Sequence, residues 1–345
     1  MIKNKNYFLK KKILLIAEIG VNHNGNLATA KKLIFAASKA GADFVKIQSF
    51  KAKEIVSHDA PKLTYQLKNT GKNESQQAML KKLELSFNQQ KKLFNYAKKR
   101  KINLISTPYD KKSAMFLHQL GVKFFKTASA DLTDQPLHVF LAKLKRPVLV
   151  SVGMASLQEI SSTLKIYKKY KNNHVAILHC VANYPCSIES LNLSVITKLK
   201  KMFKIPVGFS DHSDSFLPPI IARTLGSKIF EKHFTLNKNA RGPDHQASFN
   251  PSDFHNLKKL LEITEIAMGK PIKKCQPEER EMKKNARKSI YLLKDVKKNQ
   301  VIKSHHITLR RPGLGLLGDS YFRVCGKIAT KNLSSGKLLL KKDFA

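Results

Sequence analysis

Ionisable side chains stand at the ends of short apolar runs along this chain of 345 residues. His212 and His233 each close such a run, and Glu231 precedes His233 by two positions. Two neighbouring neutral imidazoles are ligands for divalent ions such as Mn²⁺, Co²⁺, Fe²⁺ or Zn²⁺. An ion with only two protein ligands keeps open positions for water and substrate, which suits polarisation of a carbonyl group. The pair predicts a metal site, with Glu231 as a neighbouring acceptor.

Lysines and hydroxyl residues form a second group at the ends of other apolar runs. Its members are Lys46, Lys126, Thr107, Ser129, Ser151 and Ser210. Ammonium and hydroxyl donors together suit a compact anion with several charges, such as a phosphate ester that also carries a carboxylate. Glu18, Gln48 and Tyr184 occupy comparable positions, at or just past strand ends.

The scaffold that must position these residues is predicted from eight apolar, β-branched runs that alternate with amphipathic stretches. The runs cover residues 13–20, 44–50, 103–109, 124–129, 147–153, 175–181, 206–212 and 228–235. Such alternation predicts parallel strands with right-handed crossovers, and eight units favour a (β/α)8 TIM barrel. A doubly wound sheet is the rival, but no G-x-G-x-x-G turn follows the first run. In a barrel, the ends of all these strands meet at one mouth.

A weak internal repeat supports the barrel. Gly41, Gly121 and Gly226 each precede a strand, and the fifth residue after them is a lysine, a lysine and a glutamate. These residues belong to strands two, four and eight, which fill the same interior layer of a barrel. A purely structural layer would be aliphatic, so two ammonium groups and a carboxylate there indicate function.

The domain organisation is predicted from a change in composition near residue 270. Residues 1–270 are assigned to the barrel, and residues 271–288 are polar with two prolines and are predicted to be a linker. Residues 289–345 contain short strand-like pieces and glycine turns, which predict a small β-rich domain.

The formal net charge of +40 raises the possibility of a polyanion-binding protein built on an inactive barrel. Only nine of the 64 basic residues are arginine, and tryptophan is absent, so we expect a solvated lysine-rich surface and no nucleic-acid partner. Four cysteines without a C-x-x-C pair fit a reducing cytoplasm. No apolar run reaches 18 residues, so we expect no membrane partner.

Seven short motifs together resemble the bacterial sialic acid synthase family, in family order and at family spacing. They are AEIGVNHNG at 17–25, AD-x-x-K-x-Q at 42–48, STP at 106–108, GFSDH at 208–212, EKHF at 231–234, GPD at 242–244 and RPGLG at 311–315. The resemblance implies a barrel followed by an antifreeze-like SAF domain, in a domain-swapped homodimer. It also implies condensation of phosphoenolpyruvate with an N-acylated mannosamine-type sugar, an acylated hexosamine, to give a nine-carbon 2-keto acid and phosphate.

The resemblance also implies roles for individual residues. The phosphoenolpyruvate contacts would be Lys46, Thr107, Lys126, Ser129, Ser151 and Ser210. The metal ligands would be His212 and His233, with Mn²⁺ as the first choice and Co²⁺ or Mg²⁺ as alternatives. The sugar contacts would be Asp131, Tyr184, Asp244 and Arg311, the last supplied by the partner's small domain. The residues near the reacting carbons, taken as catalytic, would be Glu18, Lys46, Gln48 and Glu231.

Two departures from the family pattern leave the sugar open. Asp131 replaces the usual glutamate, and Ala182 replaces an asparagine that often precedes the tyrosine. A legionaminic- or pseudaminic-acid-type synthase that uses a diacetamido-deoxyhexose is therefore an alternative. Another phosphoenolpyruvate-condensing or aldolase-type barrel with a shorter aldose is a further one. Ice binding, suggested by the small domain's name, is disfavoured because the chain lacks a flat threonine-rich array.

Overall fold

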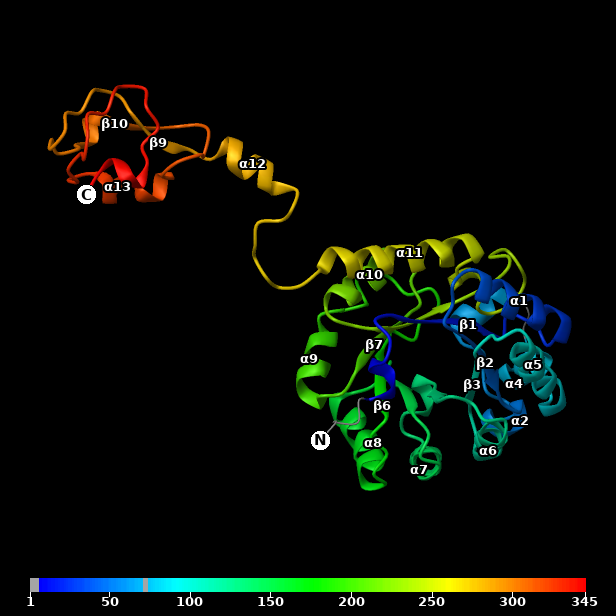
Figure 1. Cartoon of the computed structure of the whole chain (residues 1–345). Helices are drawn as coiled ribbons and strands as arrows, with labels where there is room; N and C mark the ends of the chain where they lie inside the picture. The colour runs from blue at the N-terminus through cyan, green and yellow to red at the C-terminus, as the bar shows by residue number, and fades with distance from the viewer. Residues whose placement is uncertain (1–5, 71–73) are drawn as a thin grey trace. The chain divides into compact units, whose positions relative to one another are not determined.

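The computed structural model describes residues 6–70 and 74–345, which divide into two compact units. The first unit ends at Gly269, and the second begins at Lys270. Figure 1 shows a ring of strands surrounded by helices in the first unit and short strands and turns in the second. Each unit has its own hydrophobic core.

Eight short strands form the sheet of the first unit, and each lies within one of the predicted runs. They are β1 (Leu14–Gly20), β2 (Phe44–Ser49), β3 (Leu104–Pro108), β4 (Phe125–Thr127), β5 (Val148–Ser151), β6 (Val175–His179), β7 (Val207–Asp211) and β8 (Ile229–His233). The paired strands run parallel in the order β3-β2-β1-β8-β7-β6-β5-β4. Because β3 also packs against β4, the sheet closes almost completely, and the predicted (β/α)8 barrel is confirmed.

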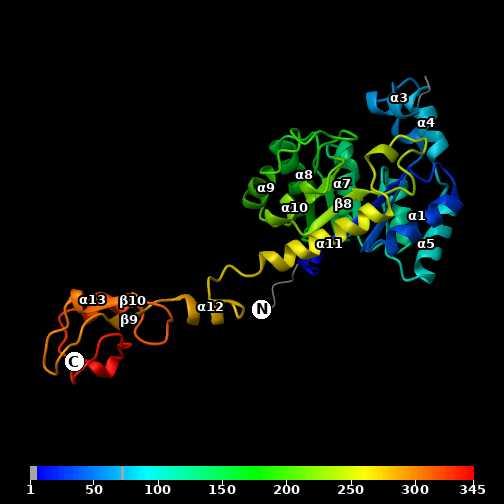
Figure 2. The ribbon, with the colours of Figure 1, turned by 90° about the horizontal axis from the view of Figure 1, so that it is seen from above.

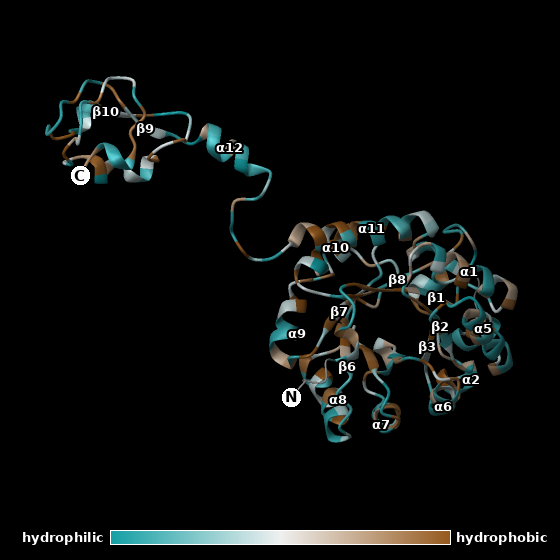
Figure 3. Cartoon of the chain, viewed as in Figure 1, coloured by the Kyte–Doolittle hydropathy of each residue, from teal (hydrophilic) through white to brown (hydrophobic). Residues whose placement is uncertain are grey.

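One longer helix follows each strand and covers the outside of the barrel. These helices are α1 (Leu27–Lys39), α5 (Phe87–Lys99), α6 (Lys111–Gln119), α7 (Gln135–Lys143), α8 (Leu157–Lys169), α9 (Val195–Phe203), α10 (Leu217–Thr224) and α11 (Pro251–Met268). Ser86 and Ser156 begin α5 and α8 with capping boxes, which satisfy amide groups that a helix start leaves unpaired. In Figure 3 the strands are mostly apolar, whereas polar residues are frequent on the surrounding helices.

The amino ends of the strands are closed by a short 3-10 helix, η1 (Tyr7–Leu9). Phe8 of this helix is fully buried, and its ring packs edge-on against Phe124 with the centroids 5.2 Å apart. It belongs to an apolar cluster with Leu14, Phe44 and Ile229, the first residues of β1, β2 and β8. This apolar cluster fills the barrel interior at the amino ends of the strands. The polar side chains predicted at the strand ends lie at the opposite, carboxyl ends.

Three short helices lie between β2 and α5, namely α2 (Ala52–Ile55), α3 (Thr64–Thr70) and α4 (Gln76–Leu83). Figure 2 shows α3 and α4 at one end of the barrel unit. Helices α2 and α4 are joined to the barrel by a small apolar cluster built on Val21, Phe50, Met79 and Leu83, with Ile55 packed against it. Since Val21 and Phe50 directly follow β1 and β2, this cluster fixes α4 to the mouth of the barrel.

The second unit contains the antiparallel strands β9 (Ser289–Leu292) and β10 (Ile307–Arg310), with the helices α12 (Glu279–Ala286) and α13 (Tyr321–Val324). Its core is made of small aliphatic residues such as Ile290, Val296 and Leu339. The β-rich character predicted for this region is confirmed, and α12 lies within the stretch predicted to be a linker. Across the described part of both units, no helix has the length and apolar character needed to span a membrane.

Candidate active site

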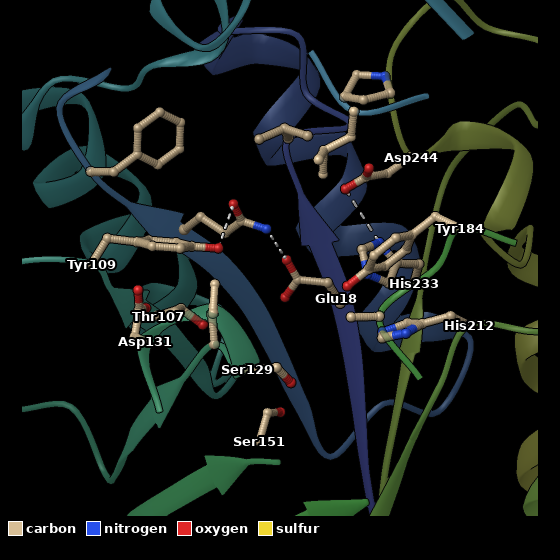
Figure 4. Close-up of a pocket in the computed structure, with 18 of the residues that line it drawn as sticks. Glu18, Thr107, Tyr109, Ser129, Asp131, Ser151, Tyr184, His212, His233 and Asp244 are labelled. Carbon is tan, nitrogen blue, oxygen red and sulfur yellow. Dashed lines mark hydrogen bonds and ion pairs between the residues drawn. The ribbon is translucent and has the colours of Figure 1, made fainter. Parts of the chain in front are cut away.

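A cavity of about 380 Å³ opens at the carboxyl ends of the barrel strands. Figure 4 shows several of the predicted site residues pointing into it from different strands. The predicted residues that line it are Glu18, Lys46, Gln48, Thr107, Lys126, Ser129, Asp131, Ser151, Tyr184, Ser210, His212, Glu231, His233 and Asp244. Arg311 belongs to the second unit, where its side chain is exposed.

Strand register explains why these residues meet. Glu18 of β1 is the register partner of Lys46 on β2 and of His233 on β8, and Ser210 pairs with Glu231. Side chains two positions apart in a strand share a face, so Glu231 and His233 enter the cavity together.

The floor of the cavity is a buried cluster of two ammonium groups and two carboxylates. Lys126 Nζ lies 3.3 Å from Glu231 Oε1 and donates to Ser151 Oγ at 2.6 Å. Lys46 Nζ forms an ion pair with Glu18, donates to Thr107 Oγ1 at 3.1 Å and lies 3.8 Å from Glu231. The layer predicted from the glycine repeat is present. The close pairing of Glu18 with Lys46 is an addition that the repeat did not indicate.

The surroundings shift the pKa values of these four groups in different directions. Burial raises the pKa of Glu18, and Lys46 only partly opposes it. Burial also disfavours a charged Lys46, but the two carboxylates outweigh it and raise the pKa of this lysine. Burial lowers the pKa of Lys126. For Glu231, burial is outweighed by Lys126 and Lys46, so its pKa is lowered. Of the two carboxylates, Glu231 is therefore more firmly ionised than Glu18.

The two histidines stand side by side at the mouth. Their ring centroids are 5.4 Å apart, and the rings are inclined by 71°. His212 Nδ1 lies 2.6 Å from the carbonyl oxygen of Val181 and must donate to it, which leaves Nε2 as the unprotonated nitrogen. His233 Nδ1 is buried without a hydrogen-bond partner and lies 3.7 Å from Asp244 Oδ2. The Tyr184 ring packs against both imidazoles.

The donor set at this place fits a divalent ion with two protein ligands. Burial lowers the pKa of His212 to about 4 and that of His233 well below its ordinary value, so both rings are neutral at pH 7. Neutral imidazole is the form that binds metals. In residues 6–70 and 74–345, no group of three or more histidine, cysteine or acidic side chains is arranged to hold a metal. An ion here would therefore complete its coordination with water or substrate.

The cavity lining also contains two carboxyls, Asp131 and Asp244, that protonate near neutrality. Burial, followed by the nearby Asp134, raises the pKa of Asp131 to about 7. Burial, followed by Glu18, raises the pKa of Asp244 to about 7. Asp131 Oδ2 is buried and has no hydrogen-bond partner. These carboxyls can donate or accept hydrogen bonds from a polar ligand.

Two tyrosines in the cavity were missed by the sequence reasoning. The Tyr109 hydroxyl donates to Gln48 Oε1 at 3.3 Å, while Gln48 Nε2 donates to Glu18 at 3.0 Å (Figure 4). Tyr109 ends a predicted strand two residues after Thr107, so its inward phase was visible in the sequence. Tyr65, whose ring lies 5.2 Å from that of Tyr184, comes from α3, and no strand pattern marked it.

One wall of the cavity is apolar. It is formed by Val21, Phe50, Ile55, Val56, Leu63, Met79 and Leu80, most of them on the inserted segment between β2 and α5. The same segment also contributes the polar groups of Tyr65, Gln66 and Gln76 to the cavity lining. Among the described residues lining the cavity, the only lysines or arginines are Lys46 and Lys126. Both face carboxylates on the floor, so no cation stands on the apolar side.

Comparisons with known proteins agree with this geometry. Residues 33–273 match the model of the NeuB family, and residues 287–345 match that of the SAF domain. The chain is 43% identical over 331 residues to an N,N'-diacetyllegionaminic acid synthase of Campylobacter jejuni, covering 95% of this chain and 99% of that one. It is 32% identical to a pseudaminic acid synthase of the same species, covering 98% of both chains. A crystal structure of an N-acetylneuraminic acid synthetase from Leptospira borgpetersenii is 30% identical and superposes with a TM-score of 0.70, covering 79% of this chain and 90% of that chain.

Proposed function

Because the chain belongs to the NeuB family of sialic-acid-type synthases, it is an enzyme that joins phosphoenolpyruvate to a sugar, and we propose that this sugar is a diacetamido-deoxyhexose. The product is then a nine-carbon 2-keto acid of the legionaminic type, released with inorganic phosphate. The 43% identity to a diacetyllegionaminic acid synthase over nearly the whole chain carries the proposal. The first expectation was an N-acylated mannosamine-type sugar; its sialic-acid form, N-acetylmannosamine, becomes the second candidate, and a pseudaminic-type stereoisomer is the third.

The apolar lining supports a deoxygenated sugar. Val56, Met79 and Leu80 offer no hydrogen bonds to hydroxyl groups, and desolvating a hydroxyl without a partner is unfavourable. Methyl groups of acetamido and deoxy substituents gain from burial against such a wall.

In the proposed reaction, Lys46 and Lys126 hold the phosphate and carboxylate of phosphoenolpyruvate, assisted by the hydroxyls of Thr107 and Ser151. Both hydroxyls already contact these ammonium groups, so they are aligned for the anion. Carbon 3 of phosphoenolpyruvate attacks the aldehyde carbon of the open-chain sugar and forms the new carbon–carbon bond. Holding both substrates in one cavity supplies much of the acceleration.

Attack by carbon 3 leaves positive charge on carbon 2, and the carboxylates of Glu18 and Glu231 are placed to stabilise it. Water adds to carbon 2 and loses a proton, and the tetrahedral intermediate then expels phosphate to form the keto group. The sum is phosphoenolpyruvate, sugar and water in, and keto acid and phosphate out. Glu231, whose pKa is lowered by Lys126 and Lys46 against the effect of burial, suits the electrostatic role.

His212 and His233 would hold the divalent ion, with Mn²⁺ as the first candidate. When bound, such an ion supplies Lewis-acid polarisation of a carbonyl oxygen. The chain's own part is to keep both rings neutral, and the hydrogen bond from His212 to Val181 fixes the tautomer of that ring.

Mass spectrometry of the product tests the substrate. Phosphoenolpyruvate is offered with a diacetamido-deoxyhexose, with N-acetylmannosamine and with its 6-phosphate. We expect one phosphate per keto acid formed and at least tenfold higher kcat/KM with the diacetamido sugar. A preference for either of the other two sugars contradicts the proposed substrate. Absence of phosphate release with all three contradicts the proposed reaction itself.

A further inference from the structure

A buried ion pair lies behind the two histidines, on the face of β7 and β8 that points away from the cavity. Asp211 and Lys232 are register partners, and each is 1% exposed. Their chain neighbours on both sides line the cavity. Since strand side chains alternate between faces, Asp211 and Lys232 point toward the surrounding helices.

Every strong polar atom of the pair has a partner. Lys232 Nζ lies 2.7 Å from Asp211 Oδ2, also donates to the carbonyl oxygen of Ser213, and stands 4.1 Å from the centre of the Phe249 ring. Asp211 Oδ1 accepts hydrogen bonds from the amide of Ser213 at 2.9 Å and from its hydroxyl at 2.8 Å. A buried pair is tolerated only when it is satisfied in this way.

The pair ties together the backbone next to each imidazole. Asp211 and Ser213 flank His212, and Lys232 directly precedes His233. One ammonium group from β8 thus holds both ends of the short turn that presents His212. Apolar side chains of similar volume would give comparable stability without the desolvation penalty, so stability alone does not account for the pair.

We propose that Asp211 and Lys232 are positioning residues that set the spacing of His212 and His233 and thereby the affinity of the site for a divalent ion. The inference rests on the metal site of the proposed function. It assigns no contact with substrate to either residue. It concerns the Asp211–Lys232 ion pair, which links β7 to β8 beside the two imidazole rings, whose centroids are 5.4 Å apart.

The test is a Mn²⁺ titration of the metal-free, full-length enzyme, in which free Mn²⁺ is followed by electron paramagnetic resonance. Lys232→Met removes the ion pair but leaves the Asp211 carboxylate buried without its partner. The double variant Asp211→Asn/Lys232→Met removes the ion pair without leaving a buried charge. Arg223→Met is the matched control, because Arg223 is a buried cation too and is paired with a carboxylate, Glu265, but lies on helix α10. Circular dichroism shows which variants are folded.

We expect Lys232→Met and the double variant to bind Mn²⁺ at least tenfold more weakly than the wild type. At saturating Mn²⁺, their KM for phosphoenolpyruvate should change by less than twofold. Arg223→Met should lose thermal stability but keep its Mn²⁺ affinity. If the folded double variant binds Mn²⁺ as tightly as the wild type, or if Arg223→Met weakens binding equally, the positioning role is wrong while the metal site stands. A wild type that binds no Mn²⁺, Co²⁺ or Mg²⁺ overturns both.

Discussion

Glu231 lies 3.3 Å from Lys126 and 3.8 Å from Lys46, so one carboxylate contacts both ammonium groups on the cavity floor. Together with Glu18, it balances the two positive charges before any anion enters. Phosphoenolpyruvate must therefore compete with internal carboxylates for the same lysines. Such competition weakens ground-state binding, and the carboxylates become useful when positive charge develops on the substrate.

Glu231→Gln should separate these two effects. Losing the charge frees Lys126 and leaves Lys46 with Glu18 alone, so the KM for phosphoenolpyruvate should fall several-fold. Losing an electrostatic stabiliser of the transition state should lower kcat by about 100-fold. Steady-state kinetics measure both values, and the exposed Glu262→Gln variant on α11 is the control. An unchanged kcat in Glu231→Gln would remove this carboxylate from the proposed mechanism.

Lys126→Met should weaken phosphoenolpyruvate use selectively. One charge-assisted hydrogen bond is worth about 1.5–3 kcal/mol, so we expect KM for phosphoenolpyruvate to rise about tenfold or more. KM for the sugar should stay within about twofold, because Lys126 is assigned to the anion. Lys92→Met, an exposed lysine on α5, should behave as wild type. Equal losses on both substrates would argue against an anion-binding role.

His233→Ala and His212→Ala should each abolish metal-stimulated product formation. Chelation should inactivate the wild type, and added Mn²⁺ should restore it, whereas neither variant should respond to Mn²⁺. His58→Ala, which alters a highly exposed imidazole, provides the matched control. Phosphate release before and after chelation is the measurement. Near-wild-type turnover in either active-site variant would refute the metal assignment.

Asp131→Asn should change how stability depends on pH. The pKa of Asp131 is raised to about 7 by burial, so the folded state holds its proton more tightly than the unfolded state does. The free energy by which this raised pKa stabilises the folded state is fully present below about pH 4 and is lost as pH rises through about 7. His212, whose pKa is lowered to about 4, acts in the opposite direction, so wild type and variant must be compared at each pH.

Relative to Asp131→Asn, the wild type should lose up to about 4 kcal/mol of unfolding free energy between pH 4 and pH 8. Urea unfolding at several pH values measures this difference. Asp59→Asn, which alters a highly exposed carboxyl outside the cavity, serves as the control. Identical pH profiles for wild type and Asp131→Asn would contradict the burial argument.

Arg311 is proposed to act on the sugar in the barrel of a second copy. Arg311→Ala should then be inactive alone, and so should Lys46→Met. Co-expression should restore about a quarter of wild-type activity, because half of the randomly formed dimers contain one intact site out of two. Isolated mixed dimers should show about half of the wild-type activity, and light scattering checks that they are dimers. Failure to complement in a confirmed mixed dimer would exclude the swapped arrangement.

The strands and their inward-facing residues could be predicted from sequence because they depend on local rules. Alternation along a strand puts Lys46 with Gln48 on one face of β2, and Glu231 with His233 on one face of β8. The repeat of glycine before strands also indicated that Lys126 shares their layer. The order of motifs then identified the family, although it left the acylated sugar open.

The tertiary structure alone decided which of these residues touch. Glu18 meets Lys46, and Asp211 meets Lys232, because barrel closure brings separate strands into register. Tyr65 of the inserted helix α3 lies in the cavity, where its ring is 5.2 Å from that of Tyr184, and no local period encodes that contact. Periodicity specifies the face on which a side chain lies, but its partners, and with them its charge state, are set by packing between segments distant in sequence.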